Sequence, residues 1–154
     1  MTITKAVKSD LQQILDLQYL AYQSEARLLD DFTIPPLKQA LSEVEQEFAK
    51  GIFLKAVDES GEIIGSVRAF PNGDETYINK LIVHPTQQGQ GIGTKLLLAI
   101  EQECFSARYE LFTGHKSVRN IKLYERFGYT KFKEQKVSDT RTLVYMEKYN
   151  NRGK

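Results

Sequence analysis

Gln88-Gly89-Gln90-Gly91-Ile92-Gly93 is the most informative segment of this chain of 154 residues. It follows an apolar run that ends at Val83, and it precedes a segment whose apolar residues recur with helical spacing. Glycine permits positive φ and lets the backbone approach an anion without a Cβ in the way, while the free N–H groups of a helix start attract negative charge. The segment therefore predicts an anion-binding loop between a strand and a helix, although three alternate glycines alone fit a flexible turn equally well.

Two common nucleotide-binding loops fit this segment poorly. A Walker loop needs Gly-Lys followed by Ser or Thr, whereas the order here is Gly93-Thr94-Lys95. A dinucleotide fingerprint needs the spacing G-x-G-x-x-G after the first strand, but here the third glycine comes one residue early and several strands precede it. Neither nucleotide-binding fold is therefore favoured.

The sequence on both sides of the loop predicts an α+β domain with a largely antiparallel sheet. The predicted elements are, in chain order, a strand over residues 3–7, a helix from residue 11 to a break at 30–36, a helix over 37–50, strands over 52–57, 62–70 and 76–83, a helix over 92–104, a strand over 109–113, a helix over 117–127, and strands over 130–136 and 142–146. This order is β-α-α-β-β-β-α-β-α-β-β, in one domain spanning residues 1–149 with a frayed tail at 150–154.

Composition narrows the class of protein. The formal net charge of +1 lacks the basic excess of a nucleic-acid-binding protein, so no nucleic-acid partner is expected. The single cysteine, Cys104, cannot form an intrachain disulfide, and its helical phase indicates a core position. No apolar run is long enough for a membrane span and no leader segment is evident, which predicts a soluble cytoplasmic protein without a membrane partner.

Two motifs together with this element order resemble one known family. The first is the loop pattern Q-x-x-G-x-G, which is entered through the run Leu81-Ile82-Val83-His84-Pro85. The second is Leu123-Tyr124-Glu125-Arg126-Phe127-Gly128-Tyr129. Over nearly its whole length the chain is similar to the GNAT superfamily of acetyl-coenzyme A-dependent N-acetyltransferases, and specifically to its small, bacterial-type, single-domain members.

The resemblance implies a binding site for acetyl-coenzyme A as co-substrate, with no metal ion. In that family the loop amides hold the pyrophosphate, and the strand before the loop splays from its neighbour so that its backbone binds the pantetheine arm. The corresponding residues here are Leu81, Ile82, Val83, Gln88, Gly89, Gln90, Gly91, Ile92, Gly93 and Thr94. Ser117 stands where the family usually has an asparagine that contacts the cofactor; serine can cap the helix, and Asn120, one turn later, can replace that contact or simply face solvent.

Tyr124 matches the family's general acid, which protonates the departing thiolate, although a tyrosine near a helix end can also belong to the core. Members of the family often place a glutamate or histidine base on the strand before the loop, at positions that correspond to Tyr77 and Asn79, which are therefore candidate acceptor-site residues. Neither side chain is a suitable base near neutral pH. A water chain is accordingly favoured as the proton acceptor.

Three other residues, Glu75, His84 and His115, are candidates to act as a base through water. No motif places any of them at the site, and His84 beside the loop is expected to be exposed and passive. His115 lies near the predicted sheet opening.

Charges are unevenly distributed along the chain. Acidic residues outnumber basic ones in positions 1–50, and the reverse holds in positions 108–136. Such swings are common on solvated surfaces. The resemblance adds a use for them: Lys116, Arg119 and Lys122 would meet the 3′-phosphate of the cofactor, while carboxylates in the first two helices, Glu25, Asp30 and Asp31, would attract a cationic amine.

The sequence thus predicts an acetyltransferase that acts on a primary amine of a small molecule, peptide or protein by direct attack in a ternary complex. The alternative from another class is a non-catalytic acyl-coenzyme A-binding module or sensor on the same fold, which the unsuitable residues at Tyr77 and Asn79 favour and Tyr124 opposes. A homodimer agrees with the resemblance, since dimers are frequent in that family.

Overall fold

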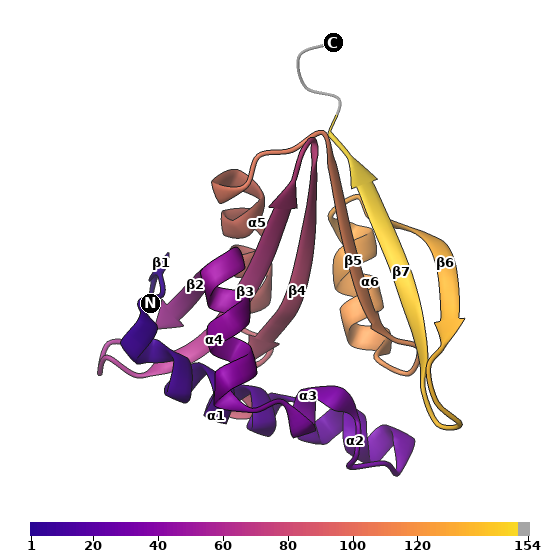
Figure 1. Ribbon diagram of the computed structural model, residues 1–154, viewed down its shortest axis with the longest axis horizontal. Coiled ribbons are helices and arrows are strands. Elements are labelled where there is room, and N and C mark those ends of the chain that lie inside the picture. Colours follow the sequence, from indigo (N-terminus) through magenta and orange to yellow (C-terminus); the bar gives the residue numbers. More distant parts are fainter. Residues whose placement is uncertain (151–154) are drawn as a thin grey trace.

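The computed structural model describes residues 1–150 and contains one seven-stranded sheet flanked by helices (Figure 1). The strands are β1 (Thr2–Lys5), β2 (Ile52–Val57), β3 (Ile63–Asn72), β4 (Glu75–Val83), β5 (Arg108–Gly114), β6 (Thr130–Lys136) and β7 (Thr142–Tyr149). The helices are α1 (Leu11–Ala21), α2 (Gln23–Leu29), α3 (Pro35–Lys38), α4 (Leu41–Lys50), α5 (Ile92–Glu103) and α6 (Val118–Arg126). The sheet order is β1-β2-β3-β4-β5-β7-β6, and all neighbours are antiparallel except β4 and β5. The predicted fold class is confirmed; the predicted tail falls almost wholly outside the described residues.

The N-terminal helices differ from the sequence prediction. The first predicted helix is divided at Tyr22 into α1 and α2, and the second is divided into α3 and α4 because Gln39 and Ala40 are extended. Gln39 is held by tertiary contacts, since its carbonyl accepts a hydrogen bond from Tyr19 and its side chain contacts Gln18. Such long-range bonds outweigh the helical periodicity of the segment.

The sheet splits between its two parallel strands. β4 and β5 pair only where residues 75–77 of β4 meet residues 108–110 of β5, and beyond this point the two strands diverge (Figure 1). A bulge in β4 accompanies the divergence: Ser66 pairs with Ile82 and Arg68 with Asn79, so two β4 residues, Lys80 and Leu81, oppose one residue of β3. Lys80 adopts a left-handed conformation with φ of 50°. The backbone of β4 after Tyr77 therefore has no neighbouring strand on its β5 side.

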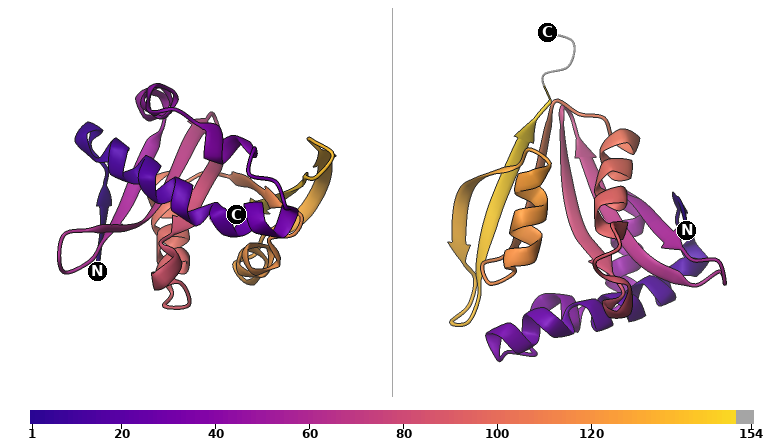
Figure 2. Two further views of the ribbon diagram at one scale, coloured as in Figure 1. Left: turned by 90° about the horizontal axis from the view of Figure 1, so that it is seen from below. Right: turned by 180° about the vertical axis from the view of Figure 1, so that it is seen from behind.

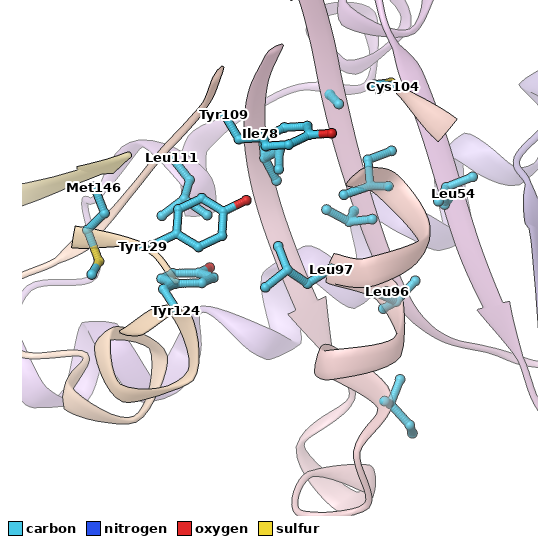
Figure 3. Close-up of a cluster of buried hydrophobic side chains, with 14 of the residues drawn as sticks. Leu54, Ile78, Leu96, Leu97, Cys104, Tyr109, Leu111, Tyr124, Tyr129 and Met146 are labelled. Carbon is cyan, nitrogen blue, oxygen red and sulfur yellow. The ribbon is translucent and has the colours of Figure 1, made fainter. Parts of the chain in front are cut away.

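Each face of the sheet has its own core. Leu96 and Leu97 of α5 pack with Tyr109, and Tyr124 of α6 packs beside Tyr129 on the same side of the sheet (Figure 3). On the opposite face, Leu11 and Ile14 of α1 and Val44 of α4 pack with Phe53 of β2. Cys104 is buried in the first core, as its helical phase predicts.

α2 crosses beneath the open end of the split and lies next to the β6–β7 hairpin (Figure 2). Asp31, just after α2, accepts a hydrogen bond of 2.5 Å from Thr140 in that hairpin, and Lys116 donates to the carbonyl of Leu28. The two halves of the sheet are thereby bridged at their open end. Across the described residues, every helix falls short of the length and apolar character that a bilayer crossing needs.

Candidate active site

A cleft of about 760 Å³ occupies the split between β4 and β5. Its walls come from β4, the glycine loop, the first turn of α5, β5 and α6, and α1 and α2 close one side. A volume of this size is typical of sites for small molecules and cofactors. Of the predicted site residues, those in the wall are Leu81, Ile82, Val83, Gln88, Gly89, Gly91, Ile92, Gly93, Thr94, Ser117, Asn120 and Tyr124.

The glycine loop forms the end of the cleft near α5. Gly89 and Gly91 both have φ of 82°, and Gly91 directly precedes the helix. A Cβ at Gly91 would meet no atom within 4 Å in the described chain, so positive φ rather than lack of space makes glycine necessary there. The first N–H groups of α5 have no partner within the helix, and they are available to an anion. Gln90 lies apart from the cleft, in a separate depression beside Lys95.

Cations surround the loop. The side chain of Gln88 accepts a hydrogen bond of 2.9 Å from Arg119 of α6, which connects the loop to the helix across the cleft. Lys116, Arg119 and Lys122 all line the cleft. Backbone donors and basic side chains together suit a ligand with several phosphate charges.

Tyr124 lies in the wall on α6, 4% exposed and packed against Tyr129 with ring centroids 6.0 Å apart. Burial raises the pKa of its phenol, so the group is neutral near pH 7 and carries a proton that it can donate. No hydrogen bond within residues 1–150 engages its hydroxyl, which leaves that hydroxyl free for a ligand.

Ser117 does not perform the predicted capping role. It occupies the N-cap position of α6, but its hydroxyl makes no capping bond and instead donates to Glu25 at 3.1 Å. The nearby carboxylate of α2 competes successfully for the hydroxyl. Asn120, one turn into α6, reaches the cleft wall.

The strand positions predicted for the acceptor site, Tyr77 and Asn79, lie outside the cleft wall. Tyr77 donates a hydrogen bond of 3.0 Å to Glu75. Asn79 pairs with Arg68 just before the bulge, and cross-strand partners project from the same face of the sheet. Arg68 is directed toward α1 and α4, because it bonds Gln18 of α1, so Asn79 also faces that side.

The three candidates to act through water are likewise outside the cleft wall. Glu75 is paired with Arg108 at 3.0 Å. The ring of His84 accepts from the backbone N–H of Thr86, and the ring of His115 accepts from that of Thr142. These rings are held by local backbone contacts.

The acidic residues expected to attract a cationic amine are already engaged. Glu25 lines the cleft, but its carboxylate lies 2.7 Å from Nε of Arg141, and both side chains are more than nine-tenths buried. Asp31 accepts hydrogen bonds from Thr140 and Thr33, which lower its pKa to about 2. The charge of Glu25 is therefore offset by Arg141, whereas Asp31 keeps its charge but, like Asp30, lies outside the cleft wall.

Tyr22, Lys80 and Arg141 are among the wall residues that sequence reasoning missed. Lys80 sits on the bulge, and burial together with the charge of Arg68 lowers its pKa to about 8. Burial raises the pKa of Tyr22 to about 12. The polar pair Asn79-Lys80 interrupts the alternation of the strand, but the sequence alone does not identify this interruption as a bulge. The partner of Arg141 lies in a distant helix.

Within residues 1–150, no group of three or more His, Cys, Asp or Glu side chains is arranged to hold a metal ion.

Comparisons with known proteins agree with this geometry. The model of the acetyltransferase (GNAT) family matches residues 11–129. The UPF0157 protein YqkA of Bacillus subtilis is 24% identical over 142 residues, which are 92% of this chain and 40% of that protein. The chain thus spans well under half the length of this curated relative.

Solved structures share the fold at low sequence identity. The ribosomal-protein-S18-alanine N-acetyltransferase of Escherichia coli has a TM-score of 0.79 and 16% identity, covering 96% of this chain and 92% of that one. An aminoglycoside 6′-N-acetyltransferase complexed with coenzyme A has a TM-score of 0.74 and 19% identity, covering 97% of each chain. A phosphinothricin acetyltransferase of Sinorhizobium meliloti in complex with acetyl-coenzyme A has a TM-score of 0.75 and 20% identity, covering 96% of this chain and 87% of that one. With the family match extending over most of its length, the chain belongs to the acetyltransferase (GNAT) family.

Proposed function

We propose that this chain transfers the acetyl group of acetyl-coenzyme A to the primary amine of an acceptor in a direct ternary complex. The observation that carries the proposal is the meeting of three features in one cleft: the glycine loop at the start of α5, the unpaired edge of β4, and the buried phenol of Tyr124. Two similar structures contain coenzyme A or acetyl-coenzyme A, which supports the choice of co-substrate.

The residues of the cleft fit that co-substrate. The left-handed glycines and the free amides of residues 92–94 would hold the pyrophosphate, and Arg119 and Lys122 would face the remaining phosphate. The β4 backbone at Leu81, Ile82 and Val83 would hydrogen-bond the pantetheine arm. When bound, the co-substrate supplies a thioester, which is an activated acetyl group.

Two groups of this chain would promote the transfer. A β4 amide directed at the thioester carbonyl stabilises the negative charge that develops on its oxygen, a contribution of about 3 kcal/mol per donor in other enzymes. The acceptor nitrogen forms a bond to the carbonyl carbon, the carbon–sulfur bond breaks, and the phenol of Tyr124 gives its proton to the sulfur. The acceptor's own proton passes to water, which then restores the phenol.

The experiment that tests this proposal measures free thiol released from acetyl-coenzyme A with a panel of amines. Tyr124→Phe removes the proton donor but preserves the ring, and kcat is expected to fall by a factor of about 10² or more at unchanged cofactor affinity. Leu123→Met, a change next to Tyr124 that retains the phenol, is the matched control and should alter kcat only slightly. Unchanged kcat in Tyr124→Phe would remove the general-acid role.

The non-catalytic module is the second candidate, because none of the five residues considered as bases lines the cleft. It predicts tight binding of acetyl-coenzyme A with no thiol release for any amine. That result in the panel would replace the transferase proposal.

A further inference from the structure

We propose that the acceptor is a small amine that also carries a carboxylate, held by Lys80 and Arg141 at the end of the cleft away from the glycine loop. The inference rests on the proposed function and adds the substrate class.

The cleft wall has a strong excess of positive charge. Six cationic side chains line it, and Glu25 is the sole carboxylate among the described lining residues. Four of the cations, Lys116, Arg119, Lys122 and Arg126, lie on or just before α6. The phosphates of the co-substrate would account for the cations near the loop, whereas Lys80 comes from β4 and Arg141 directly precedes β7.

Lys80 and Arg141 share one electrostatic neighbourhood with the reactive phenol. The charge of Arg141 contributes to lowering the pKa of Lys80, after burial and Arg68. Tyr22 interacts with Arg141 and also with Tyr124, since it raises the pKa of Tyr124 after the larger effect of burial. Lys80, Arg141 and Tyr124 all line the same cleft, so an acceptor whose amine faces Tyr124 would share that cleft with both cations.

The charges of this neighbourhood do not cancel. Glu25 offsets Arg141, and Glu47 offsets Arg68 at 2.9 Å. The side chain of Lys80 forms no ion pair or hydrogen bond with any residue in 1–150. Because Glu47 lies 2.9 Å from Arg68, the half-buried Lys80 leaves this neighbourhood with one positive charge in excess. A buried charge without a partner is costly, so this site favours a ligand that brings a negative charge.

Arg141 also retains free hydrogen-bonding capacity. Its side chain is 6% exposed, and its contact with Glu25 is through Nε, whose N–H is not aligned with the carboxylate. In the described chain, its two terminal nitrogens make no hydrogen bond. A guanidinium can present these two donors to a carboxylate in parallel, and an ammonium such as Lys80 adds a point charge.

The reactive form of an amino acid matches this charge. Attack needs the neutral amine, and an amino acid with a neutral amine is a monoanion, which complements the unmatched charge of Lys80. A polyamine would instead add positive charge to a region whose carboxylates, Glu25 and Glu47, are already paired.

The test compares each of several amino acids with its carboxamide, which has the same amine and side chain but no negative charge. Leucine, phenylalanine and β-alanine with their amides are suitable pairs, with thiol release as the assay. Rates are divided by the neutral fraction of the amine, because the amide is the weaker base. We expect the wild-type kcat/KM to favour the carboxylate by at least tenfold in at least one pair.

Lys80→Met should reduce this carboxylate-to-amide ratio by at least tenfold, and Lys80→Arg should restore most of it. Lys50→Met, which removes an exposed lysine at the end of α4, is the matched control and should leave the ratio unchanged. Equal corrected rates for acids and amides, or a ratio insensitive to Lys80→Met, would overturn the inference while the transferase proposal stands. Weaker binding of coenzyme A in Lys80→Met with an unaltered ratio would assign Lys80 to the co-substrate instead. Absence of thiol release with every amine would remove the proposed function and this inference together.

Discussion

Removing Arg141 from its pair with Glu25 should destabilise the protein strongly. The side chains are 6% and 8% exposed, and in Arg141→Met the carboxylate of Glu25 keeps only the hydrogen bond from Ser117. Breaking a buried pair by removing one partner typically costs about 3–5 kcal/mol. We expect the lower end, about 3 kcal/mol, because Nε of Arg141 and the carboxylate are close but not aligned for a hydrogen bond.

For a chain of this size, a loss of about 3 kcal/mol corresponds to a decrease in Tm of about 6–12 °C. The assay is urea unfolding followed by circular dichroism, with thermal unfolding as a second measurement. The double variant Glu25→Gln with Arg141→Met removes both charges and leaves an amide for Ser117, so it should recover at least half of the loss.

An exposed pair provides the control. Lys131 and Glu134 on β6 form an ion pair with side chains about half exposed, and Lys131→Met should change the free energy of unfolding by no more than about 0.5 kcal/mol. A loss below about 1 kcal/mol in Arg141→Met would refute the reasoning. A double variant as unstable as the sum of the two single variants would also refute it, since the two charges would then be independent.

Two further substitutions and one thiol-labelling experiment test separate features of the structure. Gly91→Ala forces alanine into a φ of 82°, which costs about 1 kcal/mol of backbone strain. The resulting displacement of the loop amides should weaken coenzyme A binding at least tenfold, as measured by calorimetry. Gly61→Ala, with φ of 88° in a distant turn, is the control and should leave that affinity unchanged. Cys104 is buried and burial raises the pKa of its thiol, so it should react with an aromatic disulfide reagent only after denaturation; rapid labelling of the native protein would contradict this packing. The folded pKa of Asp31, about 2, lies below the usual value, so the contribution of Asp31 to stability should be complete above about pH 4 and lost as the pH falls toward 2. Asp31→Asn should therefore lower Tm at pH 7 but not at pH 2. Equal effects on Tm at both pH values would exclude this linkage.

The features that local sequence determines were predicted well. The glycine loop follows from the backbone requirements of Gly89 and Gly91, and the strands follow from alternation between turn residues. The predicted helix boundaries near Tyr22 and Gln39 were wrong. At Gln39, hydrogen bonds from Tyr19 and Gln18 hold the residue in an extended conformation. Those partners are distant in sequence, and helical periodicity carries no information about them.

The acceptor end of the cleft was predicted poorly for a similar reason. Glu25 was expected to attract a cationic amine, but it is paired with Arg141, which only the full fold of the sheet brings to it. Ser117 was expected to cap α6, yet Glu25 takes its hydroxyl. Charge counts along a sequence give the number of charges, whereas pairing between distant segments decides which of them faces a ligand.

The bulge at Lys80 connects these observations. In a regular strand, alternation would place Leu81 and Val83 on the same face of the sheet as Tyr77 and Asn79. At the bulge, Lys80 and Leu81 together oppose a single residue of β3, and this reverses the alternation beyond it. Leu81 and Val83 therefore pack toward α5, while Lys80 reaches the cleft. The same bulge lies just beyond the last β4–β5 pair, where the strand edge becomes free. One local irregularity thus accompanies both the free edge that would bind the co-substrate and the presentation of the cation that would select the acceptor.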